Sequence, residues 1–312
     1  MILHRGAMNK ANRLAACLAV IGVLTSNAVA APLETPFSFA RSEIDIKISV
    51  RGKTLNAIVD TGVDPSVIDI ADADSLGLKV DRSASGEAGG FGQGHGATVY
   101  PATIDGLSIG GRSFAAFEAL ASDTSAYAGP DQPKIDAVLG YSFLSDKIVL
   151  IDYVAHKLAI LDRPGEAETA VGACRTHWRI PLKTFESYPV IPGFRFGDAT
   201  GPVTLDTGSS GGIGLLPAAL DLAGLRGALV DQGASIRRGA RGQSKVETYA
   251  LNQPVGFGPF SLPPGQRVFV RNQQDDSPGR VANIGNALLA ELQIKMLLDY
   301  RARLMTFYGD CR

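Results

Sequence analysis

The feature that most constrains this chain is a short acidic turn that occurs twice, at Asp60-Thr61-Gly62 and at Asp206-Thr207-Gly208. Each copy follows a largely apolar run, Ala57-Ile58-Val59 in the first and Val203-Thr204-Leu205 in the second, which is typical of a buried strand. A carboxylate at the end of such a strand is costly to desolvate unless it has partners. We therefore expect the two turns to meet. Two carboxylates at close range share a proton, so the pair can act as acid and base at once.

The first thirty residues have the pattern of a secretion signal. Three basic residues precede an apolar run at 14–24, which is too short to span a bilayer, and small residues at 27–30 complete a cleavage pattern. We expect a signal peptide over residues 1–30, export to the periplasm or outside the cell, and no stable membrane insertion. The alternative is a short N-terminal anchor that stays in place.

Charge and histidine content exclude several classes of function. Removal of the signal leaves 27 basic and 31 acidic residues, a net charge of −4, which argues against nucleic acid or an anionic membrane as a partner. No pair among the four histidines has the helical spacing of metal ligands, so neither a metal site nor a cofactor is expected. The histidines are His4, His95, His156 and His177.

Two cysteines, Cys174 and Cys311, remain after the signal is removed. An even pair in an exported protein indicates one disulfide, which would close the second half of the chain into a loop. The alternative is a pair of unbonded buried thiols.

The second half of the chain repeats the landmarks of the first. A glycine that follows two apolar or nearly apolar residues lies 80 residues after Asp60, at Gly140, and 79 residues after Asp206, at Gly285. The remaining landmarks also match in order: Leu76-Gly77-Leu78 with Ala223-Gly224-Leu225, Phe143-Leu144 with Leu288-Leu289, and Ile151-Asp152-Tyr153 with Leu298-Asp299-Tyr300. Such agreement indicates one structural unit written twice.

The expected secondary structure is mainly β. Polar and apolar residues alternate over 43–50, and short β-branched or apolar runs occur at 55–59, 148–152 and 157–161. Short helices are predicted at 70–76, 141–145, 217–223 and 286–292. Many short strands and glycines favour a β-barrel-like lobe, present twice. We place the lobes at 43–162 and 176–310, with a linker at 163–175.

Three segments of the first half, 57–62, 66–68 and 137–144, resemble the retropepsin-like aspartic protease family. The two-lobed arrangement is similar to pepsin-like enzymes, and the resemblance covers roughly residues 43–308. It implies a mainly β fold of two pseudo-two-fold-related β-barrel lobes with short helices. It also implies an aspartic endopeptidase that acts on extended peptides or proteins, with apolar residues on both sides of the cut.

The resemblance implies a role for each matched residue. Asp60 and Asp206 would hold one water, with one carboxylate taking its proton and the other donating to the peptide carbonyl. Gly140 and Gly285 would pack beneath the turns. The residues expected to support the pair are Thr61, Gly62, Thr207, Gly208 and Ser209.

One position departs from the family pattern. Val63 follows the first triplet, where a small residue is usual, whereas Ser209 follows the second. A hydroxyl there is expected to hydrogen-bond the nearby carboxylate, and valine cannot do so. The sequence therefore predicts two unequal carboxylates.

A glycine-rich segment at 86–96 is the candidate for a flap over the cleft, with Gly90, Phe91 and Gly92 at its centre. So many glycines allow a hairpin that closes on a bound peptide. The alternative is a surface loop with no part in the chemistry.

Other enzyme classes fit the sequence less well. The segment 208–212 matches the pattern of a serine-hydrolase elbow, but that class needs a histidine after the serine, and all four histidines precede it. A glycosidase could use two carboxylates, yet it would not require two matched turns. A non-catalytic pepsin-like module that binds peptides or proteins remains the alternative. Because one chain carries both lobes, we expect a monomer with intramolecular lobe pairing.

Overall fold

The computed structural model describes residues 32–312, apart from 126, 128–131 and 272–278. The predicted signal peptide, 1–30, lies outside the described residues. Strands of the described part fall into three sheets. In the same part of the chain, no helix is long and apolar enough to cross a membrane.

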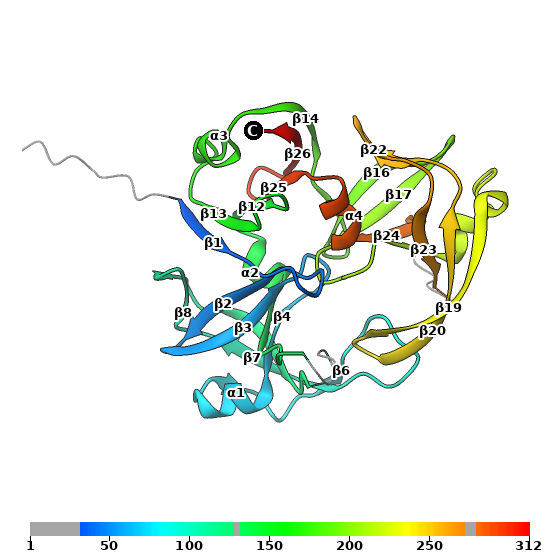
Figure 1. Ribbon diagram of the computed structural model, residues 1–312. Coiled ribbons are helices and arrows are strands. Elements are labelled where there is room, and N and C mark those ends of the chain that lie inside the picture. The colour runs from blue at the N-terminus through cyan, green and yellow to red at the C-terminus, as the bar shows by residue number, and fades with distance from the viewer. Residues whose placement is uncertain (1–31, 126, 128–131, 272–278) are drawn as a thin grey trace, which may run out of the picture. The chain divides into compact units, whose positions relative to one another are not determined.

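The first ten-stranded sheet comes from the first half of the chain (Figure 1). Its strands are β2 (Asp45–Val50), β3 (Lys53–Val59), β4 (Ser66–Asp69), β5 (Lys79–Val80), β6 (Gly86–Glu87), β7 (Thr98–Ile104), β8 (Leu107–Ile109), β9 (Arg112–Ser113), β10 (Phe117–Ser122) and β11 (Ala137–Leu139). They lie in the order β5-β7-β10-β4-β11-β3-β2-β8-β9, with β6 also beside β7. Strand β3 is buried at its end and delivers the chain to Asp60.

The second ten-stranded sheet comes from the second half. Its strands are β15 (Lys183–Phe185), β16 (Tyr188–Phe196), β17 (Ala199–Asp206), β18 (Ile213–Leu215), β19 (Leu229–Gly239), β20 (Gly242–Leu251), β21 (Val255–Phe257), β22 (Phe260–Leu262), β23 (Gln266–Val270) and β24 (Ala282–Gly285). They lie in the order β19-β20-β23-β18-β24-β17-β16-β21-β22, with β15 beside β16.

The two sheets repeat one topology. In the first, β3 lies parallel to β11, which lies antiparallel to β4. In the second, β17 lies parallel to β24, which lies antiparallel to β18. In each sheet the acidic turn begins where the first of these three strands ends: Asp60 follows β3, and Asp206 is the last residue of β17. The repeated glycine lies at the end of the second strand: Gly140 follows β11, and Gly285 is the last residue of β24. The fold-class prediction is confirmed: the protein is mainly β, with two acid-protease-like lobes.

A third, six-stranded sheet joins strands from both halves, in the order β1-β13-β12-β25-β26-β14 (Figure 1). Its strands are β1 (Leu33–Pro36), β12 (Ile148–Asp152), β13 (Lys157–Leu161), β14 (Cys174–Pro181), β25 (Lys295–Asp299) and β26 (Leu304–Cys311). At its centre β12 and β25 run antiparallel, with Leu150 opposite Leu297. All five residues of β12 are buried; the first four are apolar, and the fifth, Asp152, forms an ion pair with Lys295 of β25.

Short helices follow the acidic turns and the repeated glycines, as predicted. They are α1 (Ile70–Ser75), α2 (Tyr141–Leu144) and α4 (Asn286–Glu291). The segment predicted as a helix at 217–223 is a 3-10 helix, η1 (Pro217–Asp221), and a second one follows at η2 (Arg226–Ala228). Asp69 caps α1 by accepting the main-chain N–H groups of Ala71 and Asp72.

The predicted linker contains a further helix, α3 (Glu166–Val171). Alanine and glutamate favour this conformation, and the buried side chains of Ala167 and Val171 pack in a cluster with Ile148 and Leu161. The helix ends at Gly172, whose φ of +71° suits glycine. The lobe boundaries themselves stay a prediction.

The predicted disulfide is present. Cys174 opens β14 and Cys311 ends β26, and the two residues lie opposite each other in the antiparallel pair. Their sulfurs are bonded across a sequence separation of 137 residues. The bond therefore ties the start of the second half to its end, at the edge of the six-stranded sheet.

We expect the Cys174→Ser/Cys311→Ser variant to lose about 3–5 kcal/mol in the free energy of unfolding, because a long closed loop restricts the unfolded chain. Urea denaturation followed by circular dichroism measures the loss. Reduced wild-type protein is the matched control and should unfold at the same urea concentration as the variant. An unchanged midpoint in the variant would contradict a stabilising role for this bond.

Candidate active site

The two acidic turns meet through reciprocal threonine hydrogen bonds. The main-chain N–H of Thr61 donates to Oγ1 of Thr207 at 2.9 Å, and the N–H of Thr207 donates to Oγ1 of Thr61 at 3.1 Å. Each hydroxyl in turn donates to the opposite strand, to the carbonyl of Leu205 at 3.0 Å and to that of Val59 at 2.8 Å. Both threonines are buried, so these bonds satisfy polar groups that water does not reach.

The glycines of the turns let the carboxylates approach each other. A Cβ atom at Gly62 would lie 2.8 Å from Oδ1 of Asp206, and one at Gly208 would overlap the carboxylate of Asp60. The N–H of Gly62 donates to Oδ1 of Asp60 at 2.6 Å, and that of Gly208 donates to Oδ1 of Asp206 at 3.0 Å. The structure thus brings both acids of the repeat into one half-buried pair.

The repeated glycines lie against the loops that follow the turns. A Cβ atom at Gly140 would overlap Val63, and one at Gly285 would lie 2.8 Å from Oγ of Ser209. Next to them, the N–H of Tyr141 donates to the carbonyl of Val63 at 2.8 Å, and that of Asn286 donates to the carbonyl of Ser209 at 2.9 Å. The two copies therefore support their turns in the same way.

A chain of polar side chains supports Asp206. Arg280 donates to Oγ1 of Thr204 at 3.0 Å, Thr204 donates to Oδ1 of Asn283 at 2.8 Å, and Nδ2 of Asn283 donates to Oδ2 of Asp206 at 2.8 Å. A guanidinium group can only donate hydrogen bonds, so Arg280 makes Thr204 an acceptor and fixes the donor and acceptor of each following hydrogen bond in this series. Both carboxylate oxygens of Asp206 consequently accept an N–H, one from Gly208 and one from Asn283.

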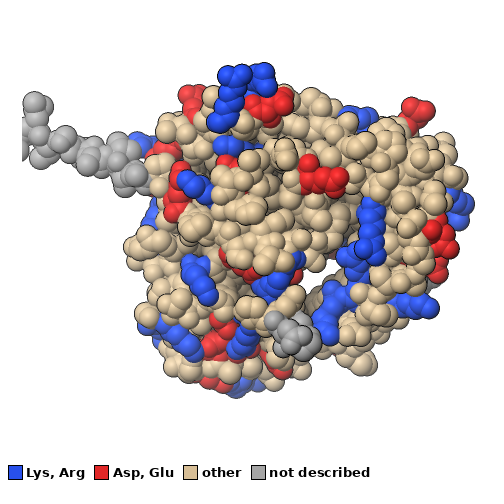
Figure 2. All heavy atoms as spheres, in the orientation of Figure 1, with Lys and Arg blue, Asp and Glu red and all other residues tan. Residues whose placement is uncertain are grey.

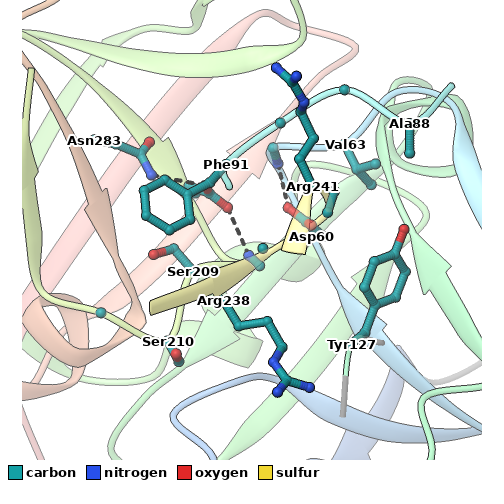
Figure 3. Close-up of a pocket in the computed structure, with 18 of the residues that line it drawn as sticks. Asp60, Val63, Ala88, Phe91, Tyr127, Ser209, Ser210, Arg238, Arg241 and Asn283 are labelled. Atoms are coloured by element: carbon teal, nitrogen blue, oxygen red, sulfur yellow. Dashed lines mark hydrogen bonds between the residues drawn. The ribbon is translucent and has the colours of Figure 1, made fainter. Parts of the chain in front are cut away.

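The equivalent positions beside Asp60 are apolar. Strand pairing places Val138 opposite Ile58 in the first sheet and Asn283 opposite Thr204 in the second. Ile58 and Val138 are buried in a cluster against which Val63 and Tyr127 pack. In the view of Figure 3, Asn283 and Ser209 lie on one side of Asp60, while Val63 and Tyr127 lie on the other.

This difference makes the two carboxylates unequal. Burial, and then the nearby charge of Asp206, raise the pKa of Asp60 well above its ordinary value. Asp60 accepts main-chain N–H groups from Gly62 and Gly208, whereas Asp206 accepts the side-chain amide of Asn283 as well as a main-chain N–H, so we assign the proton shared by the pair to Asp60. Burial and the charges of the two acids also raise the pKa of Tyr188, whose ring contacts the Gly62 turn.

Several residues at this site were missed by the sequence analysis. The sequence predicts unequal carboxylates from Val63 and Ser209. In the structure, the difference between Asp60 and Asp206 comes from Asn283, Thr204 and Arg280. The side-chain donor to Asp206 is the Asn283 amide, while Ser209 contributes its main-chain carbonyl to Asn286. A signal was present, because Thr204 and Asn283 are polar residues that each stand between two apolar neighbours in a buried part of a strand.

A cavity of about 1520 Å³ lies over the carboxylate pair. Asp60 and Asp206 line it, together with Gly90 and Phe91 of the predicted flap and residues of β19. The predicted flap therefore lies at the same site as the two acids. Within the described residues, no group of three or more His, Cys, Asp or Glu side chains could hold a metal ion.

The predicted flap meets a second hairpin from the other half of the chain. The N–H of Arg241, between β19 and β20, donates to the carbonyl of Phe91 at 3.0 Å, and the N–H of Gly94 donates to the carbonyl of Arg241 at 2.7 Å. A Cβ atom at Gly92 would overlap the main chain of Arg241, which is why the contact needs glycine. The β19–β20 hairpin was not predicted as a wall of the site.

We expect Asp60→Asn to raise the thermal unfolding temperature at pH 7. An acid with a raised pKa in the folded state contributes stability that is present below about pH 4 and is lost as the pH rises through the folded pKa. The neutral amide avoids that loss, so the gain should fade toward pH 3–4. Scanning calorimetry at several pH values measures it.

The exposed Asp198 supplies the matched control, since Asp198→Asn should leave the unfolding temperature nearly unchanged at every pH. A gain for Asp60→Asn that persists undiminished at low pH would argue against a protonated Asp60.

The comparisons with known proteins agree with this geometry. Residues 46–143 match the family model described as aspartyl protease. This segment includes Asp60, the predicted flap and Gly140. No curated protein matches the chain. The match over residues 46–143, together with the mainly β, two-lobed fold, supports an aspartyl-protease-like family for the protein.

Proposed function

We propose that the protein is an aspartic endopeptidase in which Asp60 and Asp206 activate a water molecule for attack on a peptide bond. The observation that carries the proposal is the pair itself. Two acids 146 positions apart in sequence are brought together by buried threonine hydrogen bonds, at the bottom of a cavity large enough for a peptide segment. The aspartyl protease match supports hydrolase chemistry in general.

The asymmetry of the site suggests which acid does what. Asp206 accepts N–H donors on both oxygens, so it enters the reaction as the carboxylate and takes a proton from the water. Asp60, with a raised pKa, enters protonated and donates to the carbonyl oxygen of the peptide. As the C–N bond breaks, Asp206 gives the proton that it took from water to the leaving amine, and Asp60 recovers a proton from a hydroxyl of the tetrahedral intermediate, which becomes the carboxylic acid. Both groups end the cycle as they began.

The substrate would bind as an extended strand between the two hairpins. Such a segment is held by main-chain hydrogen bonds, and its alternate side chains enter pockets. The flap residues 86–96 and the β19–β20 hairpin meet above the pair, so these contacts would separate to admit a protein chain. We further propose an exported protein that acts as a monomer, because one chain supplies both acids.

Asp60→Asn and Asp206→Asn should each lower cleavage of casein, or of a fluorogenic peptide, by more than about 1000-fold, because the remaining carboxyl cannot be both acid and base. Pepstatin should inhibit the wild-type protein. Purified enzyme is assayed by fluorescence, with Asp198→Asn as the control. Retained cleavage in either variant would overturn the assignment, and peptide binding without cleavage by the wild type would favour a non-catalytic peptide-binding module.

Asn283→Val tests the unequal roles, since it gives Asp206 the apolar neighbour that Val138 gives Asp60. Loss of an amide donor to a charged acceptor should lower kcat/KM by about 10- to 100-fold. The acidic limb of the pH profile should also move to higher pH, because the N–H favours the ionised form. Steady-state kinetics from pH 3 to 8 measures both effects.

The exposed Asn252 provides a control, as Asn252→Val should leave the profile in place. A fall in kcat/KM at every pH with no shift of the acidic limb would mean that Asn283 only holds the fold together.

A further inference from the structure

One wall of the cavity is rich in arginine. The second half of the chain contributes six arginines to the lining, which are Arg237, Arg238, Arg241, Arg267, Arg271 and Arg280. Figure 2 shows basic side chains gathered beside a hollow, over the region that β19 and β20 occupy in Figure 1. A peptide in the cavity would therefore lie against a strongly positive surface.

Arg237 of β19 stands next to the loop that follows Asp206. Its guanidinium lies over the ring of Phe269, 4.6 Å from the centroid. Its Nη1 atom is 3.2 Å from the position of a Cβ atom at Gly211, and that same position is 3.7 Å from Oγ of Ser209. The cation thus lies beside the loop that follows Asp206, among the residues that line the cavity.

Arg267 of β23 reinforces this positive charge. Arg267 and Phe269 are two residues apart in β23, so their side chains lie on the same face of the strand, and the guanidinium of Arg237 lies over Phe269. Burial, and then the charge of Arg267, lower the pKa of Arg237, as expected for neighbouring cations. In the part of the chain that the structure describes, none of the ion pairs includes Arg237 or Arg267. Because neither of these two neighbouring cations forms an ion pair with a carboxylate of the described residues, together they form a site suited to an anion.

Besides Asp60 and Asp206, four acids line the cavity, and among the described residues none of them forms an ion pair with Arg237 or Arg267. Glu43, Asp64 and Glu87 come from the first half of the chain, and Glu186 precedes β16. Arg238, Arg241, Arg271 and Arg280 have interactions of their own, so the inference rests on Arg237 and Arg267.

We propose that Arg237 and Arg267 form a carboxylate-binding subsite, which selects peptide substrates that carry Asp or Glu close to the cleaved bond on the Asp206 side. This proposal rests on the proposed peptidase function. It differs from the apolar preference that the family resemblance implies. An extended peptide advances about 3.3 Å per residue, so a cation beside the loop after Asp206 is reached by a side chain within a few residues of the bond.

A peptide series tests the subsite. Pairs of peptides differ only by Glu or Gln, placed in turn at each of the three positions on either side of the cleaved bond. At one position the wild-type protein should favour Glu by about 5- to 20-fold in kcat/KM, the range expected for a charge-assisted hydrogen bond in a partly exposed site. The preference should shrink at high salt, and also below about pH 4, where Glu becomes neutral.

Variants identify the residues responsible. Arg237→Gln and Arg267→Gln should each reduce the Glu-to-Gln ratio, and the double variant should bring it close to one. Arg237→Glu should reverse the preference in favour of Lys at the same position. Arg226 is exposed and lies outside the cavity lining, so Arg226→Gln should keep the wild-type ratio.

The outcomes separate this proposal from the peptidase assignment. Equal cleavage of Glu and Gln peptides by the wild type, or an unchanged ratio in the double variant, would overturn the subsite while leaving the peptidase intact. If no peptide is cleaved, the peptidase assignment fails instead. Fluorescence anisotropy of the labelled Glu and Gln peptides on Asp206→Asn then decides the subsite, with equal affinities counting against it.

Discussion

The crossed hydrogen bonds between Thr61 and Thr207 are the interaction on which the rest of the site depends. Each threonine satisfies the N–H of the other turn and a carbonyl of the other strand, so neither turn is complete alone. Leaving a buried partner of this kind unsatisfied costs about 1–3 kcal/mol. The hydrogen bonds between the threonines and the main chain of the opposite turn therefore hold the two carboxylates close together, despite the repulsion between the acids.

The six-stranded sheet supplies the scaffold for that meeting. Strands β12 and β25 come from opposite halves and pair along their whole length. The disulfide closes the outer edge of the same sheet, where β14 lies beside β26. The two turns thus sit above a base that both halves share. On the cavity's other side, the predicted flap and the β19–β20 hairpin meet through main-chain hydrogen bonds near their tips.

Much of this was predictable because it is local or repeated. The acids, the supporting glycines and the short helices follow from patterns that lie within a few residues of one another, or that recur at matched spacing. Contacts between the first and second halves of the chain could not be predicted in this way. Nothing in the sequence of 148–152 says that it pairs with 295–299, and nothing in 86–96 says that it meets Arg241. The polarity of Thr204 and Asn283 was visible, but its meaning required knowing that the two residues are neighbours.

The chain from Arg280 to Asp206 also bears on why two lobes should share one polypeptide. A dimer of identical halves must surround both acids with the same groups, and can become unequal only by breaking its own symmetry when substrate binds. In this protein the amino-acid sequence itself makes the two acids unequal. Asp206 has Thr204 and Asn283 nearby, whereas Asp60 has Ile58 and Val138 at the equivalent positions. The two acids of the free protein therefore already differ, and the cleft has a defined direction.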